Sequence, residues 1–298
     1  MPWHVVTRMP GRKDDALEVS ASGWGVTAVT GDSRQGRVDY DLRDHVALIT
    51  GAGRGIGAAI ARLLGHAGAA VVLAGRTGTD LERTTQHIVS TGGRADCVVA
   101  DVRREDDCAR MVEHATTRFG QLTALVNNAG IAGPTKTLDT LSLAEWDDVI
   151  ATNLTGVFLA CRAAIPALRA AGGGSIVMIG SVTGKRPLPA RTPYASAKLG
   201  LVGLTRTLAH ELGPSRITVN LISPWLVEGP RLDAVISGMA ARERRDAAAV
   251  RAELVALSPL QCGVSELDVA RLAAFFLSPG GQHMTGQDIN ISAGAVMY

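Results

Sequence analysis

Aromatic residues and cysteines are both scarce in this chain of 298 residues. Aromatic side chains make up 4% of it, and the cysteines number four, with no CxxC spacing among them. This pattern argues against a disulfide framework and against a zinc site. The seven histidines do not cluster, so we expect no metal site. We interpret the cysteines as reduced core thiols; they are Cys97, Cys108, Cys161 and Cys262.

The chain also lacks a strong net charge and a long apolar run. Its formal charge is +2 at pH 7, which gives no reason to expect nucleic acid or a membrane surface as partner. No apolar run approaches the roughly 20 residues of a membrane span. The N-terminus reads MPWHVVTRMPGRKDD, in which proline, arginine, lysine and aspartate interrupt any signal-peptide core. These absences predict a cytoplasmic protein.

Glycine, at 34 residues, and apolar side chains, at 46%, are abundant. Residues 1–40 show little periodicity and mix glycine, serine and charged residues with two tryptophans. We interpret them as a loosely ordered N-terminal extension, and expect deletion of residues 1–38 to leave the melting temperature nearly unchanged. From residue 41 to residue 298 the pattern is regular, which predicts one domain.

Short apolar runs alternate with longer helical patterns throughout residues 41–298. Such unbroken apolar runs are typical of parallel strands that are buried on both faces. The chain therefore predicts an α/β protein with a doubly wound parallel sheet, helices on both faces, and a ligand site beyond the carboxyl ends of the strands. Strands are expected at 45–50, 69–75, 97–100, 124–130, 175–181, 217–223 and 287–292. Helices are expected at 58–68, 80–91, 105–119, 142–170, 194–212 and 266–278.

The first expected strand ends in a glycine-rich turn, TGAGRGIG, whose glycines have the spacing GxxxGxG. Small residues allow a tight turn and let the N–H groups of the following helix meet a pyrophosphate. A purely structural turn is the alternative. The position between a buried strand and a helix favours dinucleotide binding.

The second expected strand ends in Gly75 and Arg76, with no acid before Asp80. An NAD site usually places a carboxylate here to accept from the ribose hydroxyl. Arg54 in the glycine turn adds a second cation, and guanidinium groups suit a 2′-phosphate. Two solvated surface arginines are the alternative. The sequence thus predicts NADP(H) as cofactor.

Tyr194 and Lys198 are four residues apart in the segment TPYASAK. They share one helix face, and a nearby ammonium group stabilises a phenolate by roughly 4 kcal/mol at about 4 Å and an effective dielectric near 20. The pair suits proton transfer to or from a reacting oxygen. An amphipathic helix with an aromatic anchor is the alternative.

With these motifs in order, residues 41–298 resemble a short-chain dehydrogenase/reductase of the common single-domain type. The matching segments are TGAGRGIG, Asp101-Val102, NNAG at 127–130, Asn153, Ser181, and Tyr194 with Lys198. The resemblance implies a Rossmann-type, seven-stranded sheet and hydride transfer between NAD or NADP and an alcohol or carbonyl. It also implies a homotetramer or homodimer.

Family roles carry over to four catalytic residues. Tyr194 would be the general acid/base, Ser181 would hydrogen-bond the substrate oxygen, and Lys198 would hold the nicotinamide ribose and stabilise the phenolate. Asn153 would support a water in the proton relay. The expected cofactor-binding residues are Gly51, Arg54, Gly55, Ile56, Gly57, Arg76, Asp101, Val102, Asn128, Ala129, Gly130, Tyr194, Lys198, Pro224 and Val227.

Two departures from the family pattern follow the sixth expected strand. Trp225 follows Pro224 where the family often has glycine, and Gly229 stands where a threonine often contacts the nicotinamide. Trp225 either walls the pocket or packs in the core. Residues 225–263 are expected to form a substrate lid, with ARERRDAAAVRAEL in a helix that has a charged outer face.

The sequence of the loop at 182–192 does not identify the substrate. It contains Lys185, Arg186 and Arg191, which could attract an anionic substrate or could belong to a solvated loop or a subunit contact. The leading hypothesis is an NADP-dependent oxidoreductase that interconverts a small-molecule ketone and a secondary alcohol. The alternatives are a catalytically idle cofactor-binding scaffold and an NAD-dependent alcohol dehydrogenase.

Overall fold

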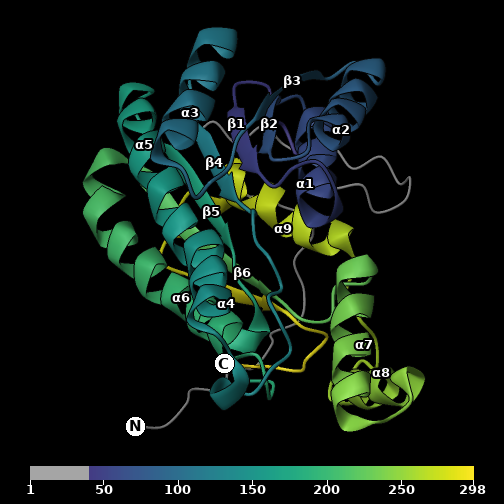
Figure 1. The fold of residues 1–298 in the computed structure, drawn as a ribbon. Coiled ribbons are helices and arrows are strands. Elements are labelled where there is room, and N and C mark those ends of the chain that lie inside the picture. The colour runs from purple at the N-terminus through teal and green to yellow at the C-terminus, as the bar shows by residue number, and fades with distance from the viewer. Residues whose placement is uncertain (1–39) are drawn as a thin grey trace, which may run out of the picture. The chain divides into compact units, whose positions relative to one another are not determined.

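A computed structural model describes residues 40–298. The predicted N-terminal extension, apart from residue 40, lies outside the described residues, and so does the expected effect of deleting it. The described residues form a parallel sheet between two layers of helices (Figure 1).

The sheet has seven strands in the order β3-β2-β1-β4-β5-β6-β7, all parallel. The strands are β1 (Val46–Thr50), β2 (Ala70–Gly75), β3 (Arg94–Val99), β4 (Ala124–Asn127), β5 (Gly174–Ile179), β6 (Ile217–Pro224) and β7 (Asp288–Ile291). The order reverses between β1 and β4, which is where doubly wound sheets bind ligands. The predicted fold class, strand number and helical coverage are confirmed.

One face of the sheet is covered by helices α3, α5 and α6. They are α3 (Glu105–Phe119), α5 (Gly156–Ala170) and α6 (Thr192–Leu212). Met111 of α3, Ala160 of α5 and Leu201 of α6 belong to one buried cluster with Leu48 of β1. Figure 1 shows these helices as one layer in front of the sheet.

The opposite face is covered by helices α1, α2 and α9. They are α1 (Gly55–His66), α2 (Gly78–Ser90) and α9 (Glu266–Leu277). Ile60 of α1 and Phe276 of α9 are buried with Ile49 of β1, the neighbour of Leu48. Successive residues of β1 thus enter opposite cores, because side chains alternate across a strand. This double burial is why the strands appear in the sequence as unbroken apolar runs.

Strand β3 begins before the expected segment 97–100. It starts at Arg94, and Arg94 and Asp96 are polar residues that an apolar pattern does not detect. They are tolerated because β3 is an edge strand with partly exposed side chains.

The helical stretch at 143–170 is interrupted by a π-helical turn. It consists of α4 (Leu143–Ile150), the π-helical Ala151–Thr155 and α5. By length and composition alone, Leu143–Ala170 could cross a membrane, which differs from the expectation that no such run exists. Half of its most apolar window is buried inside the protein, so packing against the sheet accounts for its composition.

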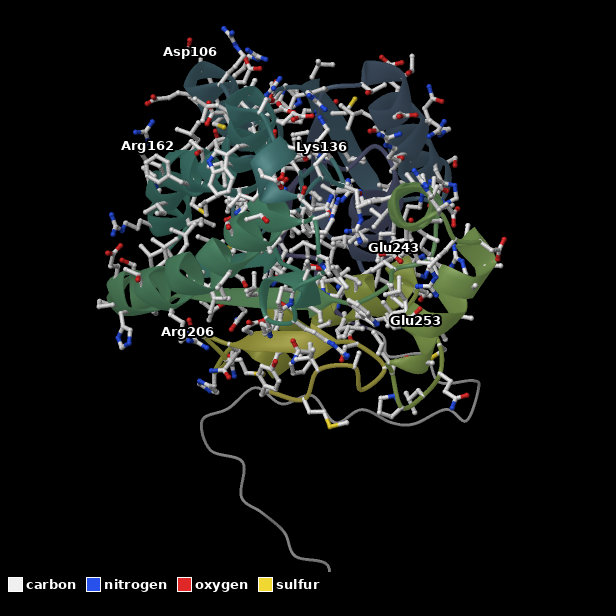
Figure 2. All side chains as sticks on the ribbon, turned by 60° about the horizontal axis from the view of Figure 1, so that its bottom comes forward. Asp106, Lys136, Arg162, Arg206, Glu243 and Glu253 are labelled. Carbon is white, nitrogen blue, oxygen red and sulfur yellow. The ribbon has the colours of Figure 1, made fainter. Side chains whose placement is uncertain are left out.

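The expected lid contains two helices rather than one, α7 (Pro230–Glu243) and α8 (Ala247–Ala256). Arg244 has a left-handed φ of 53°, which ends α7, and the Asp246 side chain caps α8 by accepting from the N–H of Ala249 at 2.9 Å. Charged side chains, including Glu243 and Glu253, cover the outer surface as predicted (Figure 2). Val227 pairs with Val264 in an isolated parallel bridge that joins the two ends of the segment.

Short 3-10 helices complete the described structure. They are Leu138–Thr140, Val182–Gly184, Gly213–Ser215 and Pro279–Gly281.

Candidate active site

A cleft of about 700 Å³ lies at the carboxyl ends of the strands. The glycine turn and the ends of β2 and β3 line one part of it. Ser181, Tyr194 and Lys198 line another part, and α7 contributes Arg231 and neighbouring residues. The structure therefore brings the predicted cofactor turn and the predicted catalytic residues into one cavity.

Two glycines of the turn are required by its geometry. Gly51 has a φ of 67°, a conformation that glycine adopts without strain. A Cβ on Gly57 would lie 2.3 Å from the carbonyl oxygen of Gly51. Gly57 does not line the cleft, and its lack of a side chain lets α1 begin directly against the turn; its contact with the cofactor stays a prediction.

The Asn128 side chain also has a structural role. Its Nδ2 donates to the carbonyl oxygens of Thr50 and Gly51, at 3.1 and 3.0 Å. The Thr50 hydroxyl in turn accepts from the backbone N–H groups of Asn128 and Ala129, both at 3.1 Å. These bonds fasten the end of β4 to the glycine turn. The sequence analysis did not identify Thr50 as a site residue, although it is the first residue of the motif.

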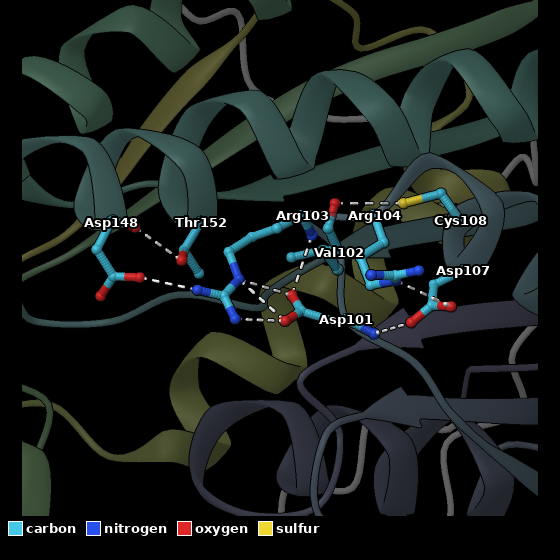
Figure 3. A network of polar contacts seen from close by, with 8 residues as sticks. All are labelled: Asp101, Val102, Arg103, Arg104, Asp107, Cys108, Asp148 and Thr152. Atoms are coloured by element: carbon cyan, nitrogen blue, oxygen red, sulfur yellow. Dashed lines mark hydrogen bonds and ion pairs between the residues drawn. The ribbon is translucent and has the colours of Figure 1, made fainter. Parts of the chain in front are cut away.

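At the end of β3, Asp101 is held by a network of ion pairs (Figure 3). The Arg103 guanidinium donates to Asp101 at 2.6 Å and to Asp148 of α4 at 2.9 Å. Its hydrogen bonds to Asp101 hold the pKa of that carboxyl below its ordinary value. Asp101 and Val102 both line the cleft, as expected of the adenine end.

Arg54, in the glycine turn, and Arg76, directly after β2, are exposed and line the cleft. Within residues 40–298, neither guanidinium is paired with a carboxylate. Gly75 directly precedes Arg76, and a Cβ there would meet Leu81 at an ordinary contact distance of 3.4 Å. This part of the cleft thus combines two unpaired cations with space where an NAD site would place an acid.

Tyr194 and Lys198 face each other across one turn of α6. The Lys198 Nζ lies 5.8 Å from the centre of the Tyr194 ring and donates to the carbonyl oxygen of Ile179 at 2.7 Å. No hydrogen bond of the Tyr194 hydroxyl is formed within the described chain. This hydroxyl is therefore free to meet a bound molecule.

Ser181 lies at the end of β5 and lines the same cleft. Its hydroxyl oxygen accepts from the N–H of Thr183 at 3.1 Å. Accepting this bond fixes the oxygen and leaves the O–H proton available to a substrate oxygen.

Asn153 holds the backbone beside the cleft. It is fully buried in the π-helical turn and does not line the cleft. Its Oδ1 accepts from the N–H of Ile131 at 2.8 Å, and its Nδ2 donates to the carbonyl oxygen of Ile131 at 2.9 Å. The carboxamide therefore fixes the loop after β4, and its support of a relay water stays a prediction. π-Helical turns often occur at functional sites.

The pKa of Lys198 is lowered to about 7, first by burial and second by the nearby Arg231. In the unfolded chain a lysine titrates near 10.4. Below pH 7 folding must therefore bury a charged ammonium group, whereas between pH 7 and 10 folding releases its proton and the cost falls as pH rises.

We expect the Lys198→Met variant to be more stable than the original protein at pH 6, and this advantage to shrink by about 2 kcal/mol between pH 6 and pH 9. Denaturant unfolding at both pH values measures the difference. Lys136→Met, which removes a half-exposed lysine, is the control. A stability difference that does not change with pH would contradict the burial of a charged Lys198.

The three cations of the 182–192 loop have different positions. Lys185 forms an ion pair with Asp288 at 2.8 Å, and Arg186 donates to the carbonyl oxygen of Ala295 at 3.2 Å. Both therefore brace the C-terminal segment. Arg191 is 4% exposed, lines the cleft, and stacks on Tyr194 with its guanidinium carbon 4.8 Å from the ring centre.

The sequence analysis missed Arg231, which belongs to the first turn of α7. Its guanidinium donates to the carbonyl oxygen of Gly130 at 2.8 Å, and it lines the cleft. Arg231 and Gly130 are 101 positions apart in the sequence, and no local motif marked Arg231.

The two departures after β6 also find a structural explanation. Trp225 is 2% exposed. It packs with α7 and α8 and also lines the cleft, so it is a core residue and a wall of the pocket at once. Its Nε1–H is buried without an acceptor among the described residues. Gly229 has a φ of 132°, a conformation that disfavours threonine. Pro224 and Val227 line the cleft as expected.

All four cysteines are free, but not all lie in the core. Cys108 and Cys161 are buried, and burial raises their pKa values to about 11 and about 12. Cys97 is partly exposed and Cys262 is exposed, which corrects the prediction of four core thiols.

A sequence model of the short chain dehydrogenase family matches residues 45–239. The chain belongs to this family. It is 34% identical to the 3-oxoacyl-acyl-carrier-protein reductase FabG of Pseudomonas aeruginosa, over 86% of this chain and 99% of the relative.

Two further relatives have different substrates in their names. The cis-4-hydroxycyclohexanecarboxylate dehydrogenase of Sinomonas cyclohexanicum is 36% identical, over 84% of this chain and 96% of the relative. A crystal structure of an actinorhodin polyketide ketoreductase variant with NADPH is similar with a TM-score of 0.81 and 34% identity, over 85% of this chain and 98% of that chain. The chain is thus related to oxidoreductases, among them ketoacyl reductases and a dehydrogenase.

Proposed function

We propose that this protein is an NADP(H)-dependent oxidoreductase that interconverts a small-molecule ketone and a secondary alcohol. The observation that carries the proposal is one cleft in which the glycine turn, Ser181, Tyr194 and Lys198 all take part. A nicotinamide cofactor bound there would supply or accept a hydride at the reacting carbon. The resemblance to the actinorhodin polyketide ketoreductase, whose structure contains NADPH, supports this assignment.

The residues of the cleft fit such a cofactor. The glycines at 51 and 57 allow the tight turn after which α1 begins, so that a pyrophosphate could approach the N–H groups at the start of α1. Arg54 and Arg76 would grip a 2′-phosphate, since both are unpaired within residues 40–298 and guanidinium groups bind phosphate in a bidentate way. Asp101 and Val102 would border the adenine.

The chain's own residues would transfer one proton to or from the reacting oxygen. In the direction of reduction, the Tyr194 hydroxyl donates its proton to the oxygen of the reacting carbonyl, and Ser181 donates a hydrogen bond to that same oxygen. Lys198, in its protonated form, stabilises the phenolate that remains. Asn153 would support a water in the proton relay, and its two bonds to Ile131 fix the wall of the cleft. In the direction of oxidation the proton returns to Tyr194.

An assay with a panel of ketones tests the proposal. The consumption of NADPH is measured as the loss of nicotinamide fluorescence. We expect at least one ketone to be reduced and the corresponding alcohol to be oxidised with NADP⁺. Binding of NADPH without turnover of any ketone or alcohol would favour the second candidate, a cofactor-binding scaffold. The free Tyr194 hydroxyl in the cleft argues against that candidate, because a scaffold has no use for it.

We further propose that residues 225–263 act as the substrate lid, since α7 and α8 line the cleft and their segment is joined at its base by the bridge between Val227 and Val264. We also propose a cytoplasmic location and a homotetramer or homodimer. Phe158 of α5 and Leu199 of α6 are 44% and 52% exposed, and a subunit contact would cover such apolar side chains. Light scattering after gel filtration tests the assembly.

A further inference from the structure

We propose that Arg191 and Arg231 form an anion-binding subsite beside Tyr194, and that the substrate is an oxo acid or hydroxy acid with a carboxylate within a few bonds of the reacting carbon. This inference rests on the proposed reaction at Tyr194. It deepens that reaction by naming the class of substrate.

Arg191 is a buried cation without a carboxylate partner. It is 4% exposed, and burial is the first cause that lowers the pKa of its guanidinium. Its hydrogen bond within the described chain is to the carbonyl oxygen of Gly133, at 3.3 Å. A buried charge is costly unless it is paired, and the remaining N–H groups of a guanidinium can bind a planar anion. An anionic group of a bound molecule would therefore supply the partner that the Arg191 guanidinium lacks within the described chain.

Arg231 places a second guanidinium at the same part of the cleft. It lines the cleft from α7 and is close enough to Arg191 and to Lys198 to lower the pKa values of both groups. Its bond partner Gly130 is close to Lys198, since a Cβ on Gly130 would lie 3.8 Å from the Lys198 Nζ. Arg191 and Lys198 thus flank Tyr194, and Arg231 lies in the same cleft. Within residues 40–298, no carboxylate forms an ion pair with any of them.

The acids that line the cleft are held elsewhere. Each of three acidic side chains is already paired with an arginine outside this group: Asp80 with Arg83, Asp101 with Arg103, and Glu228 with Arg251. A fourth acid, Glu266, lies near the glycine turn, where its Oε1 would be 3.5 Å from a Cβ on Gly55. None of these carboxylates neutralises the cations around Tyr194.

The position of Arg191 indicates how close the substrate's anion must be to its carbonyl. Its guanidinium carbon lies 4.8 Å from the centre of the Tyr194 ring, and the hydroxyl of that ring has to touch the reacting oxygen. An anion held by Arg191 therefore belongs to a group a few bonds from the carbonyl. A 3-oxoacyl thioester is neutral near its ketone, and the phosphate of its carrier arm is remote, so such a substrate would leave Arg191 unpaired.

The two other cations of the same loop show that the placement of Arg191 is specific. Lys185 and Arg186 are used by Asp288 and by the carbonyl oxygen of Ala295, and neither lines the cleft. The dehydrogenase of Sinomonas cyclohexanicum, whose named substrate is a hydroxy acid, shows that the family includes enzymes for this class of substrate.

The test compares oxo acids with their methyl esters, which keep the ketone and remove the charge. 3-Oxobutanoate, 4-oxopentanoate and 4-oxocyclohexanecarboxylate, each with its ester, are reduced with NADPH. We expect kcat/KM for at least one acid to exceed that of its ester by about 10- to 100-fold, the usual range for a charge-assisted hydrogen bond. Arg191→Met should remove this preference mainly through KM, and Arg231→Met should reduce it.

Arg186→Met is the matched control, since it removes a cation of the same loop that does not line the cleft, and it should keep the preference. NADPH affinity, measured by fluorescence, should be nearly equal in all these variants. Acetate should inhibit the original protein competitively against the ketone, and Arg191→Met should be insensitive to it.

Two results would overturn the subsite. One is equal or better turnover of the ester in every pair, and the other is a preference for the acid that survives Arg191→Met. In both cases the reduction of ketones, and with it the proposed function, would stand. If no acid and no ester were reduced by a protein that binds NADPH, the proposed function would fail and this inference would fail with it.

Discussion

Tyr194→Phe is expected to lower kcat by at least about 100-fold on the substrate of this protein, because the reacting oxygen loses its proton donor. The variant should fold and bind NADPH normally. No partner within residues 40–298 depends on the Tyr194 hydroxyl, so its removal leaves no buried polar group unpaired. Steady-state kinetics with the best ketone, together with NADPH fluorescence titration and thermal melting, measures these three properties.

Tyr298→Phe serves as the control, since this tyrosine is 80% exposed and does not line the cleft. It should have unchanged kinetics. A Tyr194→Phe variant with near-normal turnover would show that another group transfers the proton. A variant that loses NADPH binding as well would show that the Tyr194 hydroxyl serves the cofactor more than the substrate.

The second large effect concerns the choice of cofactor. We expect kcat/KM with NADPH to exceed that with NADH by about 10- to 1000-fold, because each charge-assisted hydrogen bond contributes roughly 1.5–3 kcal/mol and Arg54 and Arg76 can both engage the 2′-phosphate. The double variant Gly75→Asp with Arg76→Ser should reverse the preference. The new carboxylate would accept from the ribose hydroxyl of NADH and repel the phosphate of NADPH.

The structure has room for this exchange. A Cβ at Gly75 would meet Leu81 at 3.4 Å, an ordinary contact, so the aspartate should not disturb β2. Arg83→Ser, which removes an exposed arginine paired with Asp80 on α2, is the control and should keep the preference. An original protein that prefers NADH, or a double variant that still prefers NADPH, would show that these arginines do not bind the phosphate.

Local patterns in the sequence were sufficient for the order of the elements and for the core of the site. Strands that are buried on both faces are mostly apolar, so β1, β2, β4, β5 and β6 stand out from their helices, although β6 also contains the buried polar residues Asn220 and Ser223. A glycine turn between a strand and a helix needs only nearby residues, and so does a tyrosine–lysine pair one turn apart on a helix. The polar start of β3 was missed, because an edge strand need not be apolar.

The tertiary structure decided which of several similar residues has which role. Lys185, Arg186 and Arg191 are close together in the sequence, yet two of them brace the C-terminal segment and the third stacks on Tyr194. Asn153 matches the family motif, and the structure adds that its carboxamide binds both backbone groups of Ile131, in the loop after β4.

Arg231 was not predicted, because its partner Gly130 is 101 positions away in the sequence. The sequence by itself determined the fold class, the glycine turn and the spacing of Tyr194 and Lys198, since apolar strands, a turn between a strand and a helix, and a pair one helical turn apart are all local patterns. Only the tertiary structure brought Arg191, Lys198 and Arg231 into one cleft with Tyr194, with no ion pair to a carboxylate of residues 40–298. Their placement depends on how the loop before α6 and the first turn of α7 pack over the carboxyl ends of the strands.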